Sequence, residues 1–181
     1  MEQKRYKYEI ILNLLNGSNH LRQIAKELNI NHMTIKRALE ALVKENVLDV
    51  KVQGKNNIYS IKKTLEAKNN VFISEIYKFN KFLNEHPKLK KDIIELKKLP
   101  VKLILIFGSY AKCNEKEDSD IDIYIETLDN NIKERASNIN KKFSIKIGRY
   151  DKNNLLIKEI EKNHIILNGL EIFYEKNKFF D

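Results

Sequence analysis

The sequence predicts a fold of the α+β class, in which a helical connector joins two small domains. Apolar residues recur every three or four positions over the first 45 residues, which is the spacing of amphipathic helices. Two alternating stretches around Gly54 follow, as in a β-hairpin. From Val101 onward an almost unbroken apolar run indicates a strand buried on both faces. The expected boundaries are 1–64, 65–98 and 99–181, and we expect an α/β domain with a small mixed sheet in the last segment.

The first domain is expected to contain three helices and a hairpin. The first helix ends at Asn16-Gly17, a typical C-terminal stop. Ser18 or Asn19 is expected to cap the second helix, and the turn at 29–31 separates it from the third. The expected inward positions are Tyr6, Ile10, Ile11 and Leu14, then Leu21, Ile24, Ala25 and Leu28, then Ile35, Ala38, Leu39 and Leu42. The hairpin strands are expected near 48–52 and 58–61.

This order of elements resembles a winged helix-turn-helix over residues 1–64. The resemblance implies duplex DNA as a partner, with the third helix in the major groove and the hairpin as a wing. Arg37 suits a bidentate contact to guanine, whereas lysines suit phosphates. The expected DNA-binding residues are Thr34, Lys36, Arg37, Lys44, Lys51 and Lys55.

The charge distribution agrees with this interpretation. The net charge is +9, and residues 1–64 hold 12 Lys/Arg against 6 Asp/Glu, a net of +6. The basic excess therefore lies where a DNA-binding module would need it. The alternative is a module for protein interaction or dimerisation, whose charges are simply solvated.

The connector at 65–98 is expected to form two helices. Pro87 starts the second helix and Pro100 ends it. The segment is interpreted as a packing layer or as a helical pair that forms a homodimer.

The last domain begins with a buried strand at 103–107 that ends in Gly108-Ser109. After a gap of ten residues, Asp120 and Asp122 flank Ile121 in an alternating stretch. Residues two apart on a strand share a face, so the two carboxylates project side by side. A divalent cation such as Mg²⁺ relieves their repulsion. Further helices are expected at 131–142 and 153–163, a third strand at 143–147, and an amphipathic tail at 165–174.

These residues resemble the signature of the minimal nucleotidyltransferases of the DNA polymerase β superfamily. The resemblance covers about 95–175 and implies that Gly108 and Ser109 hold a nucleoside triphosphate, with ATP expected. It also implies that Asp120 and Asp122 bind Mg²⁺ or Mn²⁺ and serve in catalysis.

The third carboxylate that active members of this superfamily usually carry is missing from the expected position. The outward residues of the strand at 143–147 are Ser144 and Lys146, and neither is acidic. A lysine opposite the aspartates would partly neutralise them and compete with a second cation. The alternative is that Asp151 or Glu126 completes the site.

Three functions remain open at this point. The first is an enzyme that transfers a nucleoside monophosphate to a hydroxyl acceptor on a protein or an RNA. The second is a DNA-binding regulator whose C-terminal domain senses nucleotide or mediates dimerisation. The third is an antitoxin-like component, because minimal nucleotidyltransferases often pair with a small helical toxin.

Composition predicts a cytoplasmic protein without a membrane segment. No apolar run approaches the roughly 18 residues that span a bilayer, and the N-terminus does not resemble a secretion signal. The single Cys113 cannot form an internal disulfide. The four histidines have no metal-ligand spacing, so no zinc site is expected.

Overall fold

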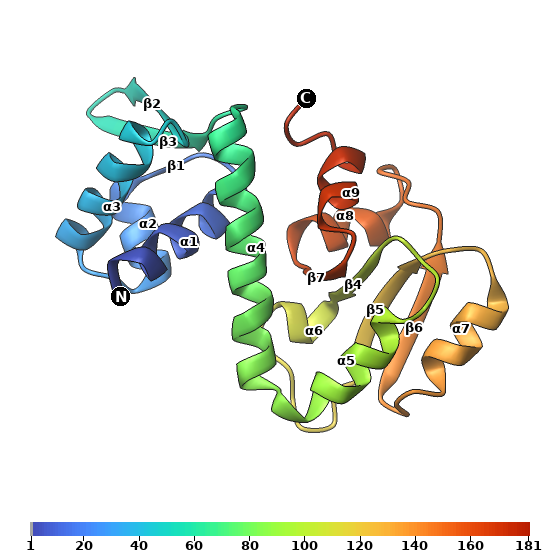
Figure 1. Ribbon diagram of the computed structural model, residues 1–181. Coiled ribbons are helices and arrows are strands. Elements are labelled where there is room, and N and C mark those ends of the chain that lie inside the picture. The colour runs from blue at the N-terminus through green and yellow to red at the C-terminus, as the bar shows by residue number, and fades with distance from the viewer. Residues whose placement is uncertain (1) are drawn as a thin grey trace. The chain divides into compact units, whose positions relative to one another are not determined.

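The structure is a computed structural model that describes residues 2–181, with side chains described from Arg5 onward. The chain divides into two compact units (Figure 1). One holds the residues up to Tyr77 together with Phe180 and Asp181, and the other is Lys78–Phe179. The helix α4 (Leu65–Glu85) belongs to both, because the division falls within it. No helix in the described part of the chain is both long and apolar enough to cross a membrane.

In the described part of the first unit, helices α1–α3 precede a β-hairpin. The elements are α1 (Glu2–Leu14), β1 (Asn19–His20), α2 (Leu21–Leu28), α3 (His32–Lys44), β2 (Leu48–Gln53) and β3 (Asn56–Ile61). All strand pairs are antiparallel, in the order β1-β3-β2. Gly54 turns the hairpin with a φ of +61°, a conformation that glycine adopts without steric cost.

Burial confirms most of the inward positions expected of these helices. The buried ones are Ile10, Ile11, Leu14, Ile24, Ala25, Ile35, Ala38, Leu39 and Leu42. Tyr6, Leu21 and Leu28 are only half-buried. The apolar periodicity therefore identified the core of this unit, and the half-buried positions mark its edges.

The expectation that Ser18 or Asn19 caps α2 was wrong. The cap is His20, whose Nδ1 accepts a hydrogen bond from the backbone N–H of Gln23 at 3.2 Å. Asn19 and His20 pair with Tyr59 and Ile58 of β3, so the chain stays extended up to Leu21. This two-residue strand depends on a partner some forty residues away, and no local pattern announces it.

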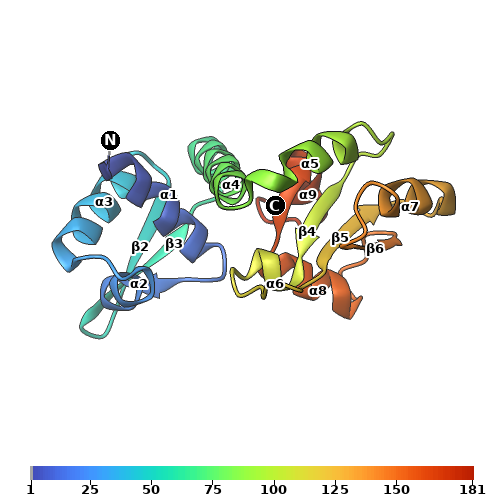
Figure 2. The ribbon, with the colours of Figure 1, turned by 90° about the horizontal axis from the view of Figure 1, so that it is seen from below.

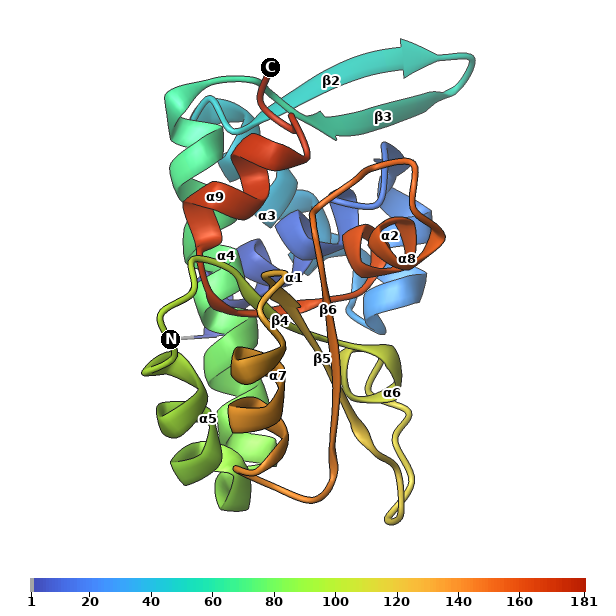
Figure 3. The same cartoon turned by 90° about the vertical axis from the view of Figure 1, so that its right-hand side faces the viewer.

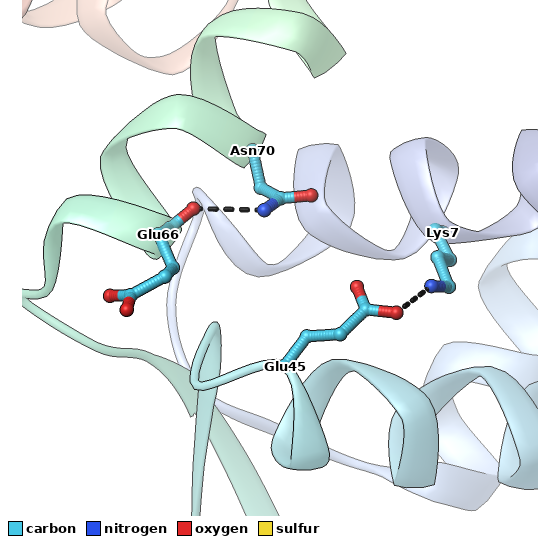
Figure 4. Close-up of polar contacts among 4 residues, drawn as sticks. All are labelled: Lys7, Glu45, Glu66 and Asn70. Atoms are coloured by element: carbon cyan, nitrogen blue, oxygen red, sulfur yellow. Dashed lines mark hydrogen bonds and ion pairs between the residues drawn. The ribbon is translucent and has the colours of Figure 1, made fainter.

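Polar contacts link the end of α3 to α1 and join two residues in the first turns of α4. Lys7 of α1 forms an ion pair with Glu45, the residue that follows α3 (Figure 4). The side-chain amide of Asn70 donates to the backbone carbonyl of Glu66 at 2.9 Å. Both partners of the ion pair keep part of their surface exposed, so it contributes about 1 kcal/mol at most.

The second unit is a mixed sheet between helices. Its elements after α4 are a 3₁₀ turn (Pro87–Leu89), α5 (Lys90–Lys97), β4 (Ile104–Phe107), α6 (Gly108–Ala111), β5 (Ile121–Glu126), α7 (Asn130–Ser137), β6 (Phe143–Gly148), α8 (Leu155–Lys162), β7 (Ile165–Asn168) and α9 (Leu170–Lys176). The strand order is β6-β5-β4-β7. β5 and β6 are parallel, whereas β4 is antiparallel to both of its neighbours. The small mixed sheet expected from the sequence is therefore present.

Alternation along the strands separates two faces of this sheet. Ile121, Ile123 and Ile125 of β5 lie in a buried cluster with residues of α5 and α7 such as Leu96 and Ile132. Figures 2 and 3 show α5 and α7 along that side of the sheet and α8 along the other. The residues of β5 between the isoleucines therefore point away from α5 and α7.

Two expectations for the last third of the chain were wrong. The helix expected at 131–142 ends at Ser137, and Asn138–Lys142 turn back toward the sheet. The tail expected as one amphipathic segment is instead β7, which pairs with β4, followed by α9. Gly169 separates them with a φ of +81°, and a Cβ there would collide with the carbonyl of Lys102.

Candidate functional site

The turn at the end of β4 brings backbone and carboxylate together. Phe107, the last residue of β4, lies opposite Asp122 in the antiparallel pair with β5. The next residue, Gly108, is buried and has a φ of +71°. A Cβ at Gly108 would overlap Oδ2 of Asp122. Only glycine therefore lets the chain turn here while the carboxylate lies against its backbone.

The other predicted residues lie beside this contact. Asp120 immediately precedes β5 and is exposed, whereas Asp122 is half-buried. Ser109 follows Gly108 in the short helix α6 and is also half-buried. The structure thus brings Gly108, Ser109 and Asp122 together around one turn. Asp120 lies two residues before Asp122, at the start of the same strand.

The loop between α6 and Asp120 is held on several sides. Nζ of Lys142 donates to the carbonyl of Glu117 at 2.8 Å, and the Ser119 hydroxyl accepts from the amide of Lys116 at 2.8 Å. Nε2 of His86 lies 3.4 Å from a carboxylate oxygen of Glu115. These contacts give the segment that delivers Asp120 a defined course. The sequence alone indicates no role for the loop, because two of its anchors are distant along the chain: His86 directly follows α4 and Lys142 directly precedes β6.

Strand pairing settles which residue faces Asp122. In the parallel pair of β5 and β6, Ser144 lies opposite Asp122, while Lys146 lies opposite Tyr124. Lys146 is exposed. The hypothesis that Lys146 lies directly opposite the aspartates was therefore wrong, because Lys146 lies two residues further along the strand pair. Ser144 occupies the position nearest to Asp122 on the neighbouring strand.

The two alternative third carboxylates lie at the other end of the strands. Glu126 is opposite Gly148, and its Oε1 is 2.8 Å from Nζ of Lys176. Asp151 follows β6 and accepts a hydrogen bond from the amide of Asn153 in an exposed turn. Four residues of strand separate the level of Asp122 from that of Glu126, which is about 13 Å. Among the side chains that the structure describes, no group of three Asp, Glu, His or Cys residues could hold a metal ion.

Tyr124 fills the sheet face between these two ends. It is buried, and its hydroxyl donates to the carbonyl of Gly148 at 3.0 Å. Burial, followed by the nearby Glu126 carboxylate, raises the pKa of Tyr124 above its ordinary value. The hydroxyl therefore remains protonated at neutral pH, and the ring leans toward the end of the sheet away from Asp122.

A second candidate surface lies on the first unit. A groove of about 540 Å³ runs between α3 and the hairpin, and both Lys36 and Lys55 line it. Its other arginine and histidine residues are His20, Arg22 and His32, which are not among the DNA-binding residues expected from the sequence. These three residues lie at the starts of α2 and α3, and this position is the sequence feature that could have identified them as groove residues.

The remaining residues expected to bind DNA lie outside the lining of this groove. Arg37, Lys44 and Lys51 are exposed, and Thr34 is half-buried. Nζ of Lys36 lies 3.9 Å from Oε1 of Glu40, which is one turn further along α3. The groove therefore presents a mainly basic surface with one acid, Glu40, on its edge.

We predict that Gly108 and Asp122 are energetically coupled. Gly108→Ala should destabilise the protein by about 1–3 kcal/mol, because it forces the added methyl group against Oδ2 in a left-handed conformation. Asp122→Ala removes the obstacle, so the double variant should be more stable than the sum of the single changes implies. Chemical denaturation of the four proteins measures this coupling. Additivity within about 0.5 kcal/mol would show that the two residues do not constrain one another.

Comparison with known proteins places the second unit in a family. The model of the family "Polymerase beta, Nucleotidyltransferase" matches residues 87–177, half of the chain. A protein of Methanocaldococcus jannaschii, provisionally named a protein adenylyltransferase, is 44% identical over 59 residues. That match covers 33% of this chain and 51% of the relative, so the chain spans about half of the relative's length.

One solved structure is similar at a lower level. The adhesin competence repressor of Streptococcus pyogenes aligns with a TM-score of 0.41 and 19% identity, over 48% of this chain and 65% of that one. A likeness of this size does not identify a fold. The family match does not depend on this likeness. The stretch that the family model matches includes Gly108, Ser109, Asp120 and Asp122. The chain therefore belongs to the polymerase beta nucleotidyltransferase family.

Proposed function

We propose that the second unit binds a nucleoside triphosphate with a divalent cation and transfers its nucleoside monophosphate to a hydroxyl group of a protein. The observation that carries this proposal is the turn at Gly108, where a carboxylate lies directly against backbone that has no side chain. ATP is the expected triphosphate. The name of the archaeal relative supports both an adenylyl group and a protein acceptor.

Each residue of the turn has a role in this proposal. Gly108 lets phosphate oxygens approach the backbone, and the Ser109 hydroxyl is a donor for them. Asp120 and Asp122 supply hard oxygen ligands, which Mg²⁺ and Mn²⁺ prefer. The donor set fits one such cation, because Mg²⁺ is usually held by one or two carboxylates together with water and phosphate oxygens. Both carboxylates are at least partly open to solvent. When bound, the cation would offset negative charge on the phosphates and make an attacking hydroxyl more acidic.

The proposed transfer is a substitution at the α-phosphorus. A bond forms between the acceptor oxygen and the α-phosphorus, the bond from that phosphorus to the oxygen bridging to the β-phosphorus breaks, and pyrophosphate leaves. The acceptor's proton passes to solvent. The residues of this chain hold the triphosphate in place and orient it for in-line attack.

We further propose that the first unit is a winged helix-turn-helix that binds duplex DNA. The element order and the basic groove between α3 and the hairpin support this proposal. Such a groove suits a phosphate backbone, because lysine and arginine release counterions when they pair with phosphates. The domain division at 1–64, 65–98 and 99–181 is part of the same proposal. The alternative function is a DNA-binding regulator that only senses nucleotide. Such a regulator would bind the nucleotide but would not transfer its nucleoside monophosphate.

We predict that Asp120→Asn and Asp122→Asn each abolish cation-dependent nucleotide binding while the protein stays folded. Thermal melts with and without ATP and Mg²⁺ measure this effect. A ligand at a hundred times its Kd adds about 2.7 kcal/mol of stability, which raises the melting temperature by several degrees. Asp118→Asn, an exposed neighbour in the same loop, is the matched control and should keep the shift. A shift that survives in both site variants would show that the carboxylates do not bind the ligand.

We also predict DNA binding that weakens steeply with salt. Replacing Arg22, Lys36 or Lys55 with alanine should weaken binding evenly across sequences and lower the salt slope by about one per lost phosphate contact. Arg37→Ala should cost about 1–3 kcal/mol and relax sequence preference if this residue contacts a base. Lys133→Ala, an exposed change on α7 of the second unit, is the control. Gel-shift titrations that detect no binding at low salt would contradict this part of the proposal.

A further inference from the structure

The neighbours of Asp122 differ from those of a site built for two cations. Ser144 is the residue opposite Asp122 on β6, and its hydroxyl carries no charge. Two cations held close together repel one another, so each additional cation requires additional negative ligands. Asp120 and Asp122 supply two carboxylates, and the residue nearest to them across the strand pair does not add a third.

Lys146 is the next residue of β6 after Ser144 that points to the same face of the sheet. It lies two residues after Ser144, so it projects from the same face of the sheet as Asp122 and Ser144. Its Cα is about 8 Å from that of Asp122, given the rise along a strand and the spacing between strands. The flexible four-carbon stem of lysine is long enough for the ammonium group to approach a ligand held at Asp122.

The surroundings leave the ammonium group of Lys146 available for a ligand. Among the described residues, no carboxylate lies within ion-pair distance of it. Glu126, the acid on the same face of β5, pairs with Lys176 and accepts from the amide of Tyr150. Tyr124 lies opposite Lys146 in the strand pair. Its hydroxyl points toward the carbonyl of Gly148 and away from Asp122. An exposed lysine without an acidic partner is suited to a phosphate oxygen.

We propose that Lys146 binds a phosphate of the triphosphate in the place of a second divalent cation, so that the site holds one cation for each nucleotide. This inference rests on the proposed nucleotide site and specifies its composition. One cation at Asp120 and Asp122 and one ammonium group at Lys146 then offset part of the negative charge of the phosphates. Ser144 keeps a second cation out, because it offers no negative ligand.

The test counts Mn²⁺ by electron paramagnetic resonance, using an ATP analogue in which a methylene group joins the α- and β-phosphorus atoms. The full-length wild type should bind one Mn²⁺ for each bound analogue, whereas Ser144→Asp should bind two. Lys146→Gln should weaken binding of the analogue about tenfold to a hundredfold, the effect of losing one hydrogen bond to a charged group. Lys133→Gln, an exposed change on α7 at the opposite face, is the matched control and should bind like the wild type.

The outcomes separate this inference from the function on which it rests. Two Mn²⁺ ions in each wild-type complex would overturn the inference and leave the nucleotide site intact. Equal affinities for Lys146→Gln and Lys133→Gln would also overturn it, because the lysine would then not contact the phosphates. A wild type that binds no analogue with Mn²⁺ would overturn the proposed function itself, and this inference with it.

Discussion

The contact between Gly108 and Asp122 is the constraint on which the candidate site depends. Asp122 cannot move away from the turn by sliding along β4, because Ile121 and Ile123 on either side are fixed in the core. A shift of one residue would bury the carboxylate and expose the isoleucines. The chain reversal at Gly108 in turn requires a left-handed φ. The packing of an ordinary apolar core therefore sets the position of the carboxylate.

The sequence could predict whatever depends on local periodicity. The buried faces of α1, α2 and α3 follow from helical spacing. The glycine, serine and two aspartates of the candidate site stand out by their types and spacing, and the family match covers them. It could not predict features that depend on pairing between distant segments. β1 exists because Asn19 and His20 find Tyr59 and Ile58, and β7 exists because β4 offers a free edge. The placement of Ser144 opposite Asp122 is likewise a matter of register, which residue types alone do not reveal.

The two units carry different kinds of surface. The first presents a groove lined by lysine, arginine and histidine, where the solvated backbone of a polyanion can be recognised through charge alone. The second presents two carboxylates that need a cation before an anion can bind there. A nucleotide would therefore enter the second site together with its cation, whereas a nucleic acid needs no cation at the first. Under the proposed function, the same chain would bind two kinds of phosphate ligand at two separate surfaces.

The central claim, that the second unit transfers a nucleoside monophosphate, is tested most directly by the position of the label in ATP. Purified protein is incubated with Mg²⁺ or Mn²⁺ and ATP labelled at either the α- or the γ-phosphorus, with and without cell lysate. The account predicts that only the α-label becomes attached to protein, with release of pyrophosphate, and that Asp122→Asn abolishes the attachment. Attachment of the γ-label, or α-labelling no greater than that of Asp122→Asn, would contradict it.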